Sequence, residues 1–181
     1  VRGDIMKKIL VVVDMQKDFV DGALGTAEAV AMVPRMVEKI RGFDGKIIVT
    51  LDTHGEDYMN TSEGKSLPVP HCIKGTPGWE LDRNIAQALE GREYTVVEKP
   101  TFGSVRLPEV IRELAAGEDF SIELSGLCTD ICVVSNALLL KANFLDAEVS
   151  VDSSCCAGVT PESHENALKA MSMCQIKIEN F

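Results

Sequence analysis

Short apolar runs rich in valine and isoleucine recur along the chain, separated by longer stretches with the spacing of amphipathic helices. These runs are KILVVVD (8–14), KIIVTLD (46–52), YTVVEK (94–99), FSIELSG (120–126), AEVSVD (147–152) and CQIKIEN (174–180). They lack strict alternation of apolar and polar residues, which is typical of strands that are buried on both faces. The pattern therefore predicts six interior β-strands.

Apolar positions three and four residues apart predict helices in the intervals between these strands. The candidate helices lie at 28–41, 79–91, 107–117, 130–145 and 160–173. The last of them has a start signal, with Thr160 as N-cap and Pro161 at the first helical position. Strands that alternate with helices predict an α/β fold of three layers (αβα), in which a mainly parallel six-stranded sheet is joined by right-handed crossovers.

Length and charge bound the number of domains and the classes of partner. The chain has 181 residues, of which 45% are hydrophobic and 25% are charged, so we predict one globular domain over 1–181. Because Met6 opens the first strand, we expect residues 1–5 to be dispensable for the fold. The formal net charge of -10 disfavours nucleic acid and anionic membrane surfaces, since both require a basic face.

The apolar content of the chain also bears on its location. No run approaches the roughly 20 apolar residues needed to span a bilayer, and the N-terminal stretch lacks a signal-peptide cleavage site, so we expect a cytoplasmic protein. In that compartment the six cysteines, two of them adjacent as Cys155 and Cys156, are expected to be reduced thiols and not a disulfide framework.

Reactive side chains follow the predicted strands. The first strand ends on Asp14, the second on Asp52 and the third on Lys99, and the fourth runs through Gly126 towards Cys132. In an open parallel sheet, ligands bind outside the carboxyl ends of the strands. We therefore expect these four reactive side chains to share one edge of the sheet and to form a site there.

The segment GLCTDICV places a thiol at the entrance of a helix. A helix that begins near Thr129 or Asp130 has Cys132 in its first turn. The free N–H groups of that turn favour an anion and are therefore expected to lower the thiol pKa. A nearby lysine is expected to lower it further. The alternative for any free cysteine is a small buried hydrophobe. A metal role for the Cys128 and Cys132 pair is disfavoured, because no second Cys or His pair lies nearby at ligand spacing.

A second set of residues has the composition of a metal site. Asp52 and His54 lie two apart after a strand, so their side chains point to the same side of an extended segment, and His71 follows a proline turn. Two imidazoles and a carboxylate suit a borderline divalent ion such as zinc, to which Glu63 could add a fourth ligand. The alternative for His71 is a hydrogen-bonded loop histidine, and a solvated or capping role is expected for His164.

These motifs together resemble those of a known family. DMQKDF, DTH, PVPHC, EKPTFGS and GLCTDICV occur in this order over nearly the whole chain. In sequence and order they resemble the nicotinamidases of the isochorismatase-like cysteine hydrolase superfamily, whose fold is Rossmann-like. The resemblance implies Asp14 as catalytic acid/base, Lys99 as catalytic lysine and Cys132 as nucleophile. It also implies a cis peptide before Cys128, with the Cys128 and Cys132 amides forming the oxyanion hole, and Asp130 as a structural neighbour of the nucleophile.

The resemblance implies a cofactor as well. It gives Asp52, His54 and His71 as ligands of one divalent metal ion, most simply zinc, with iron or manganese as alternatives. Some relatives supply the fourth ligand as another histidine soon after the D-x-H motif. This chain has no histidine there, and we take Glu63 as the substitute.

The resemblance further implies a substrate pocket with aromatic walls. Phe19 of DMQKDF corresponds to a ring-stacking wall. Family members often carry an aromatic residue three positions before the last metal histidine, where this chain has Pro68, flanked by Leu67. We therefore name Leu67 and Trp79 as candidates for the second wall.

The function implied by the resemblance is hydrolysis of nicotinamide to nicotinate and ammonia in NAD salvage. We expect a small molecule as partner, nicotinamide or an analogue, and a homo-oligomer. One alternative is a metal-free cysteine hydrolase of another small amide, such as an N-carbamoyl or ureido compound. Isochorismate hydrolysis ranks lower because it does not use a thiol at this position. The non-enzymatic alternative is a redox sensor, whose thiol would be oxidised without turnover.

Overall fold

The computed structural model describes residues 6–181, so residues 1–5, which we expected to be dispensable, lie outside the described part. Its centre is one six-stranded sheet with strand order β3-β2-β1-β4-β5-β6, and every pair of neighbours is parallel. The strands are β1 (Lys7–Val13), β2 (Lys46–Asp52), β3 (Tyr94–Lys99), β4 (Phe120–Leu127), β5 (Glu148–Ala157) and β6 (Lys177–Glu179). The predicted fold class is confirmed.

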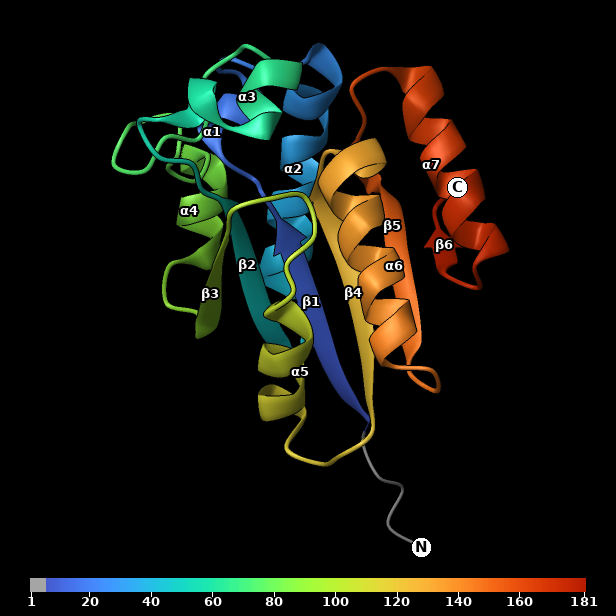
Figure 1. The fold of residues 1–181 in the computed structure, drawn as a ribbon. Helices are drawn as coiled ribbons and strands as arrows, with labels where there is room; N and C mark the ends of the chain where they lie inside the picture. The colour runs from blue at the N-terminus through green and yellow to red at the C-terminus, as the bar shows by residue number, and fades with distance from the viewer. Residues whose placement is uncertain (1–5) are drawn as a thin grey trace, which may run out of the picture.

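Helices cover both faces of this sheet (Figure 1). Helices α2 and α4 pack on one face and α5, α6 and α7 on the other, while short helices lie beyond the carboxyl ends of the strands. The helices are α1 (Lys17–Val20), α2 (Ala27–Gly42), α3 (Ser62–Ser66), α4 (Arg83–Leu89), α5 (Leu107–Ala115), α6 (Val134–Asn143) and α7 (Pro161–Met173), with a 3₁₀ turn η1 (Tyr58–Asn60) and a π-helical turn η2 (Thr129–Val133).

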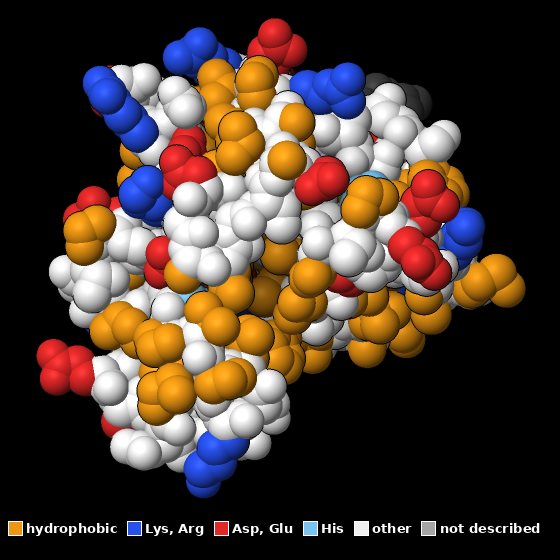
Figure 2. Space-filling model, turned by 90° about the horizontal axis from the view of Figure 1, so that it is seen from above, with side chains coloured by type: hydrophobic (Ala, Val, Ile, Leu, Met, Phe, Trp, Pro, Cys, Tyr) orange, Lys and Arg blue, Asp and Glu red, His pale blue; other side chains and the backbone are white. Residues whose placement is uncertain are grey.

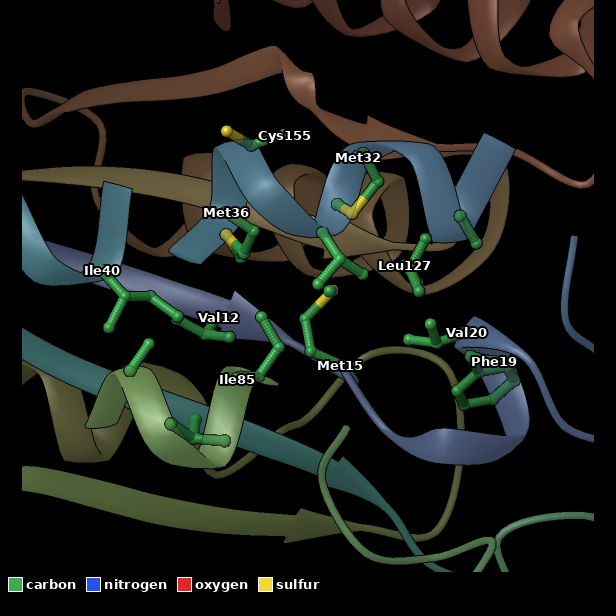
Figure 3. Close-up of a cluster of buried hydrophobic side chains, with 14 of the residues drawn as sticks. Val12, Met15, Phe19, Val20, Met32, Met36, Ile40, Ile85, Leu127 and Cys155 are labelled. Atoms are coloured by element: carbon green, nitrogen blue, oxygen red, sulfur yellow. The ribbon is translucent and has the colours of Figure 1, made fainter. Parts of the chain in front are cut away.

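The buried runs of the sequence form two cores, one on each side of the sheet. Along β1, Leu10 and Val12 contribute to the core beneath α2 and α4, whereas Ile9, Val11 and Val13 contribute to the core beneath α5, α6 and α7. Figure 3 shows the first of these cores, in which side chains of α2 and α4 meet those of β1. Because β1 is covered on both faces, its sequence shows no alternation of apolar and polar residues.

The helix signals read from the sequence correspond to local contacts. Thr160 caps α7: its hydroxyl accepts a hydrogen bond from the Ser163 N–H at 3.1 Å, and Pro161 is the first helical residue. The predicted helix at 130–145 is different, because its first turn is the π-helical η2 and regular α-helix begins at Val134. The Val133 N–H donates to the Cys128 carbonyl at 3.1 Å, five residues back, as a π-turn requires.

The last two strands differ from their predicted bounds. β5 continues to Ala157 instead of ending at 152, because the polar residues of its second half have partners: Asp152 accepts hydrogen bonds from the Ser154 N–H and hydroxyl at 3.0 and 2.7 Å. In the same part of β5 the register against β4 shifts, between Leu124 and Gly126. β6 is reduced to Lys177–Glu179.

The strand order places a change of direction between β1 and β4. From β1 the chain continues to β2 on one side, and from β4 it continues to β5 on the other, so the loops that follow β1 and β4 leave towards opposite sides. Such a point at the carboxyl ends of the strands is where open α/β sheets bind ligands.

Within residues 6–181, no helix has the length and apolar character that a membrane crossing requires.

Candidate active site

Asp14, Lys99 and Cys132 meet at the carboxyl ends of β1, β3 and β4. The Lys99 Nζ lies 2.6 Å from Asp14 Oδ2 and 3.4 Å from Cys132 Sγ. All three side chains are buried, with exposed fractions of 0% for Asp14, 1% for Lys99 and 4% for Cys132. Lys99 therefore lies between the carboxylate and the sulfur, and the structure brings together the three residues that the sequence motifs singled out.

The sheet itself holds the carboxylate in place. Asp14 directly follows β1 and has a positive φ of 47°. Its N–H donates to the Thr50 carbonyl at 3.2 Å, and the Thr50 hydroxyl on neighbouring β2 donates to Asp14 Oδ1 at 2.6 Å. With Oδ1 held by Thr50 and Oδ2 by Lys99, the carboxylate has a fixed orientation.

Burial controls protonation in this group. Desolvation, reinforced by the charge of Asp14, raises the pKa of the Cys132 thiol well above its ordinary value, and Lys99 only partly opposes this. The pKa of Asp14 is also raised, again mainly by burial and against the effect of Lys99. Our expectation of a lowered thiol pKa at the helix entrance is therefore not met, because desolvation outweighs the helix terminus and the lysine. A thiol proton must leave before Cys132 can attack, and the side chain of Asp14, which interacts with the thiol, is a candidate acceptor.

A second polar cluster adjoins this group and shares one carboxylate with it. Asp52, at the end of β2, directs Oδ1 to Lys99 Nζ at 3.4 Å and Oδ2 to His54 Nε2 at 2.9 Å and His71 Nε2 at 3.4 Å. Glu63 Oε1 on α3 lies 3.7 Å from His54 Nε2 and 3.6 Å from His71 Nε2. One ligand atom from each of these four residues lies within 4.8 Å of the others.

This second cluster fits a divalent cation. Ligand atoms placed 2.0–2.2 Å from a tetrahedral zinc ion are about 3.3–3.6 Å apart, close to the separations found here. The His71 Nδ1 lies 2.8 Å from the Val69 carbonyl, to which it donates a proton, so Nε2 is the ring nitrogen that faces the cluster. Burial raises the pKa of Glu63, whereas the pKa of Asp52 is lowered despite burial by hydrogen bonds from His54 and His71 and the charge of Lys99. Two carboxylates and two imidazoles facing one point match the donor set expected from the sequence.

Two further residues of the DMQKDF segment hold this cluster in position. The fully buried Gln16 brackets the backbone of Asp52: its Nε2 donates to the Asp52 carbonyl at 2.9 Å and its Oε1 accepts from the Asp52 N–H at 2.8 Å. Asp18 Oδ2 accepts from the Cys72 N–H at 2.8 Å, next to His71. The motif thus supplies supports as well as the acid/base, a role that we did not assign from the sequence.

The nucleophile turn begins where β4 passes close to β1. Gly126 has φ +135°, and a Cβ there would overlap the Val13 carbonyl and amide, so glycine is required. The peptide bond between Leu127 and Cys128 is cis, as the resemblance implied. The turn η2 then carries Cys132 to the edge of the sheet.

A small cavity opens between the two clusters. It is lined by Phe19, Leu24, Asp52, Glu63, Leu67, His71, Phe102, Cys128, Ile131 and Cys132. Phe19 and Leu67 are among the predicted wall residues, and the lining also includes Phe102, three residues beyond Lys99, which is 43% exposed. Figure 2 views the molecule from the side of the carboxyl ends of the strands, where hydrophobic side chains gather in patches and small areas of histidine are visible.

The remaining candidates lie outside this lining. Trp79, proposed as a second wall, instead donates its indole N–H to the Thr53 hydroxyl at 2.9 Å and packs against the core beneath α2 and α4. His164 is half-buried, and its Nδ1 lies 2.7 Å from the Thr129 hydroxyl. It therefore contacts the nucleophile turn and is neither a solvated nor a capping residue.

Comparison with known proteins identifies the family. The model of the isochorismatase domain matches residues 8–179, almost the whole described chain. The chain belongs to the isochorismatase family. An uncharacterized isochorismatase family protein of Bacillus subtilis, PncA, is 32% identical over 147 residues, which cover 74% of this chain and 78% of the relative.

Solved structures of isochorismatase-family proteins agree with the fold. A crystal structure of nicotinamidase/pyrazinamidase PncA from Bacillus subtilis superposes with a TM-score of 0.84 at 25% identity, covering 97% of this chain and 100% of the other. A pyrazinamidase of Pyrococcus horikoshii in complex with zinc gives a TM-score of 0.78 at 28% identity, covering 97% and 99% of the two chains. The likeness therefore extends over nearly all of the residues of this chain.

Besides Gln16 and Asp18, two further residues of this isochorismatase-family site were not identified from the sequence. Phe102 lies in the EKPTFGS segment, and the available signal was an aromatic side chain directly after a strand that ends at the ligand-binding edge. Asn136 is fully buried in α6, four residues after Cys132, and hydrogen-bonds the Cys132 carbonyl at 2.8 Å. A polar residue inside an otherwise apolar helix was the signal in that case.

Proposed function

We propose that this protein hydrolyses nicotinamide to nicotinate and ammonia, with Cys132 as nucleophile. The observation that carries the proposal is the arrangement of two clusters around one small cavity. Lys99 lies 2.6 Å from Asp14 and 3.4 Å from Cys132 on one side, and the four candidate metal ligands lie on the other. Nicotinamide carries a ring nitrogen and a carboxamide on one small ring, so one molecule can present one group to each cluster.

The relatives support this choice of substrate. The Bacillus subtilis structure is that of a nicotinamidase/pyrazinamidase, and the Pyrococcus horikoshii structure is that of a pyrazinamidase in complex with zinc. Both proteins cover this chain almost completely, so the comparison is between whole domains.

The cavity accounts for binding of a small flat ring. It offers about 40 Å³ of space to the centres of water molecules, far below the roughly 300–1,000 Å³ of pockets for drug-sized ligands. Phe19 and Phe102 contribute aromatic surface and Leu67 aliphatic surface to its lining. The larger hollow lined by Phe120 and Phe144 has no cysteine in its lining.

Acylation begins with proton transfer from the Cys132 thiol to Asp14. The sulfur then attacks the carboxamide carbon, and the carbonyl π electrons move to the oxygen, for which we propose the Cys128 and Cys132 amides as hydrogen-bond donors. Lys99, 3.4 Å from the sulfur and ion-paired with Asp14, stabilises the thiolate during transfer. Asp14 returns the proton to the amide nitrogen, the C–N bond breaks, and ammonia departs. The acyl group remains bound to Cys132 as a thioester.

Deacylation uses the same residues in reverse. Asp14 removes a proton from a water molecule, whose oxygen attacks the thioester carbon. The C–S bond then breaks, nicotinate is released, and the thiolate recovers a proton from Asp14. Because the pKa of Asp14 is raised by burial, this carboxylate can hold the proton between the two steps.

We propose Asp52, His54, His71 and Glu63 as ligands of the metal ion, with zinc as the first candidate and iron or manganese as alternatives. When bound, the ion supplies a coordination position for the pyridine nitrogen and so orients the carboxamide towards Cys132. Asp52 also contacts Lys99 at 3.4 Å, so the ligand set and the catalytic residues share one carboxylate.

Turnover and metal content of matched variants test the proposal. We expect Cys132→Ala to abolish ammonia release from nicotinamide while retaining metal and nicotinamide binding. His71→Ala should lower metal content and raise KM about 10- to 100-fold, since a ligand is removed far from the scissile bond. Elemental analysis of the purified protein should find about one equivalent of metal, and a chelator should suppress turnover reversibly.

A panel of small amides assayed for ammonia release distinguishes the alternatives. Full nicotinamide turnover by a demonstrably metal-free sample would refute the role given to the metal ion. Turnover of an N-carbamoyl compound in place of nicotinamide would refute the substrate. Two further predictions belong to the proposal, a cytoplasmic location and a homo-oligomeric state, and size-exclusion chromatography with light scattering tests the second.

A further inference from the structure

We propose that Asn136 is a positioning residue that ties the nucleophile turn to the loop carrying Phe102, and that it sets KM for ring substrates through this aromatic wall. The claim about KM rests on the function proposed above, whereas the positioning claim rests on contacts alone. Asn136 is neither a candidate metal ligand nor itself part of the cavity lining, so its effect on a substrate must pass through the residues that it contacts.

The side chain of Asn136 uses all of its hydrogen-bonding groups on two separate segments. Its Nδ2 donates to the Cys132 carbonyl at 2.8 Å and to the Phe102 carbonyl at 3.1 Å. Its Oδ1 accepts from the Ser104 N–H at 2.9 Å. The residue is fully buried, as are its bonds to Cys132 and Ser104, whereas its bond to Phe102 is partly buried. Such bonds are costly to lose, because each would leave a buried polar group without a partner.

The geometry requires a side-chain amide at this position. A hydroxyl on a helix commonly bonds only the carbonyl four residues back, which here is that of Cys132. Asparagine makes that bond and also reaches across to residues 102 and 104, which follow β3. The loop lies directly on the start of α6, since a Cβ at Gly103 would be 3.5 Å from the Ser135 carbonyl.

Few other side chains attach this loop to the rest of the site. Lys99 Nζ donates to the Thr101 carbonyl at 3.1 Å. Phe102 itself is 43% exposed and so is only partly fixed by packing. The position of its ring therefore depends on the main-chain bonds to Asn136, and loss of these bonds should weaken ring binding more than the chemical step.

Asn136→Asp is the primary test because it keeps the shape of the side chain. One carboxylate oxygen can still accept from Ser104, but the other replaces the donor and faces the Phe102 and Cys132 carbonyls. Asn143→Asp is the matched control: Asn143 ends the same helix and makes the same type of bond, from Nδ2 to the Leu139 carbonyl at 2.9 Å, at an exposed position. We expect a KM for nicotinamide about tenfold higher in Asn136→Asp, with a smaller fall in kcat, and values within about twofold of wild type in the control.

A double-mutant cycle with Phe102→Ala tests whether the effect passes through the ring. In the Phe102→Ala background, Asn136→Asp should raise KM by less than about twofold, because the wall is already gone. Equal increases in both backgrounds would overturn the proposal, as would a lower Tm with unchanged KM. Asn136→Ser serves where the aspartate variant does not fold. It keeps the bond to the Cys132 carbonyl and should raise KM with kcat near the wild-type value.

The same experiment separates this proposal from the proposed function. If wild type releases no ammonia from nicotinamide but hydrolyses another amide of the panel, the substrate is wrong and the cycle is measured on that amide. If no amide is hydrolysed, hydrogen exchange of peptides covering 100–105 decides. Faster exchange in Asn136→Asp than in Asn143→Asp supports positioning by Asn136, and equal exchange overturns it.

Discussion

Two lysines of this protein each bridge two carboxylates on the same sheet, and their surroundings differ. Lys99 pairs with Asp14 and Asp52 at the carboxyl ends of the strands, and its side chain is 0% exposed. Lys39 on α2 pairs with Glu123 and Asp152, the latter at 2.8 Å, and its side chain is 17% exposed.

The carboxylates of the two clusters show what these surroundings do. The pKa of Asp152 is lowered to about 2: burial raises it, but hydrogen bonds from Asn180, Lys39 and Ser154 outweigh that effect. The pKa of Asp14 is raised, because burial outweighs Lys99 and Thr50. Asp152 is thus held as an anion, whereas Asp14 can accept a proton. The two clusters have similar charges, but Asp152 stabilises the fold as an anion and Asp14 can carry a proton. The balance between hydrogen bonding and burial determines which role each carboxylate has.

The largest expected difference between the clusters follows from removing each lysine. Lys99→Met should lower kcat/KM for nicotinamide by at least about 10³-fold, because the thiolate loses its nearby cation and Asp14 its partner. Lys39→Met should leave kcat/KM within about twofold of wild type and lower the free energy of unfolding by about 1–2 kcal/mol. Steady-state kinetics and urea denaturation measure both. A comparable loss of turnover in Lys39→Met would refute the division into a reactive and a structural cluster.

Replacing the proton carrier should affect the chemical step alone. Asp14→Asn cannot accept the thiol proton, so we expect thioester formation to slow by about 10²–10⁴-fold. Rapid-quench single-turnover experiments with nicotinamide measure this step directly. Asp152→Asn is the matched control and should form the thioester at the wild-type rate. Unimpaired acylation in Asp14→Asn would exclude Asp14 as the acceptor.

Acid titration should sharpen the contrast from the structural side. Because the pKa of Asp152 is about 2 in the folded protein and ordinarily 3.8, its contribution to stability is complete above the ordinary value and is lost as the pH falls through about 2. Asp152→Asn should therefore cost about 1–2 kcal/mol of unfolding free energy at pH 6, and the difference from wild type should shrink between pH 4 and 2. Urea denaturation at several pH values checks this. A difference independent of pH would show that the ionised form is not what stabilises the fold.

The smallest effect is expected at the neighbouring thiol. Cys128→Ala should keep turnover within about threefold of wild type, since we assign only its backbone to the reaction. Its side chain packs in the core beneath α2 and α4, so a loss of about 1 kcal/mol in stability is expected. Loss of activity comparable to that of Cys132→Ala would mean that the wrong thiol has been named.

The order of strands and helices was predictable because it depends on burial. Strands such as β1, covered by helices on both faces, carry uninterrupted apolar runs that can be recognised without tertiary information. The second half of β5 was missed because Ser153 and Ser154 are polar. Ser153 donates to the carbonyl of Asn180, and Ser154 bonds Asp152. The contact of Ser153 depends on a residue distant in the sequence, which a local pattern does not reveal.

The candidate site was predictable in its residues but not in its electrostatics. Motif and strand-end position identified Asp14, Lys99 and Cys132, which the fold then brings together. The direction of the thiol pKa was predicted wrongly, because burial of the sulfur depends on how the loops close over it. The choice of Trp79 over Phe102 had a similar cause: side-chain direction in a loop is set by tertiary contacts, such as the bond from Trp79 to Thr53.

Gly126 fixes the distance between the two central strands, whereas parts of the cavity wall lie on other loops. The sequences of these two regions can therefore change at different rates in evolution. The Gly126 backbone passes so close to Val13 that no side chain can intervene, so the spacing of the central strands, which carry the acid/base and the nucleophile, is set by main-chain atoms. Two walls of the cavity, Leu67 and Phe102, come instead from segments 62–67 and 100–104, which follow β2 and β3. Selectivity for a ring can then be changed by substitutions at Leu67 and Phe102, while the acid/base and the nucleophile keep their places at the ends of the central pair of strands.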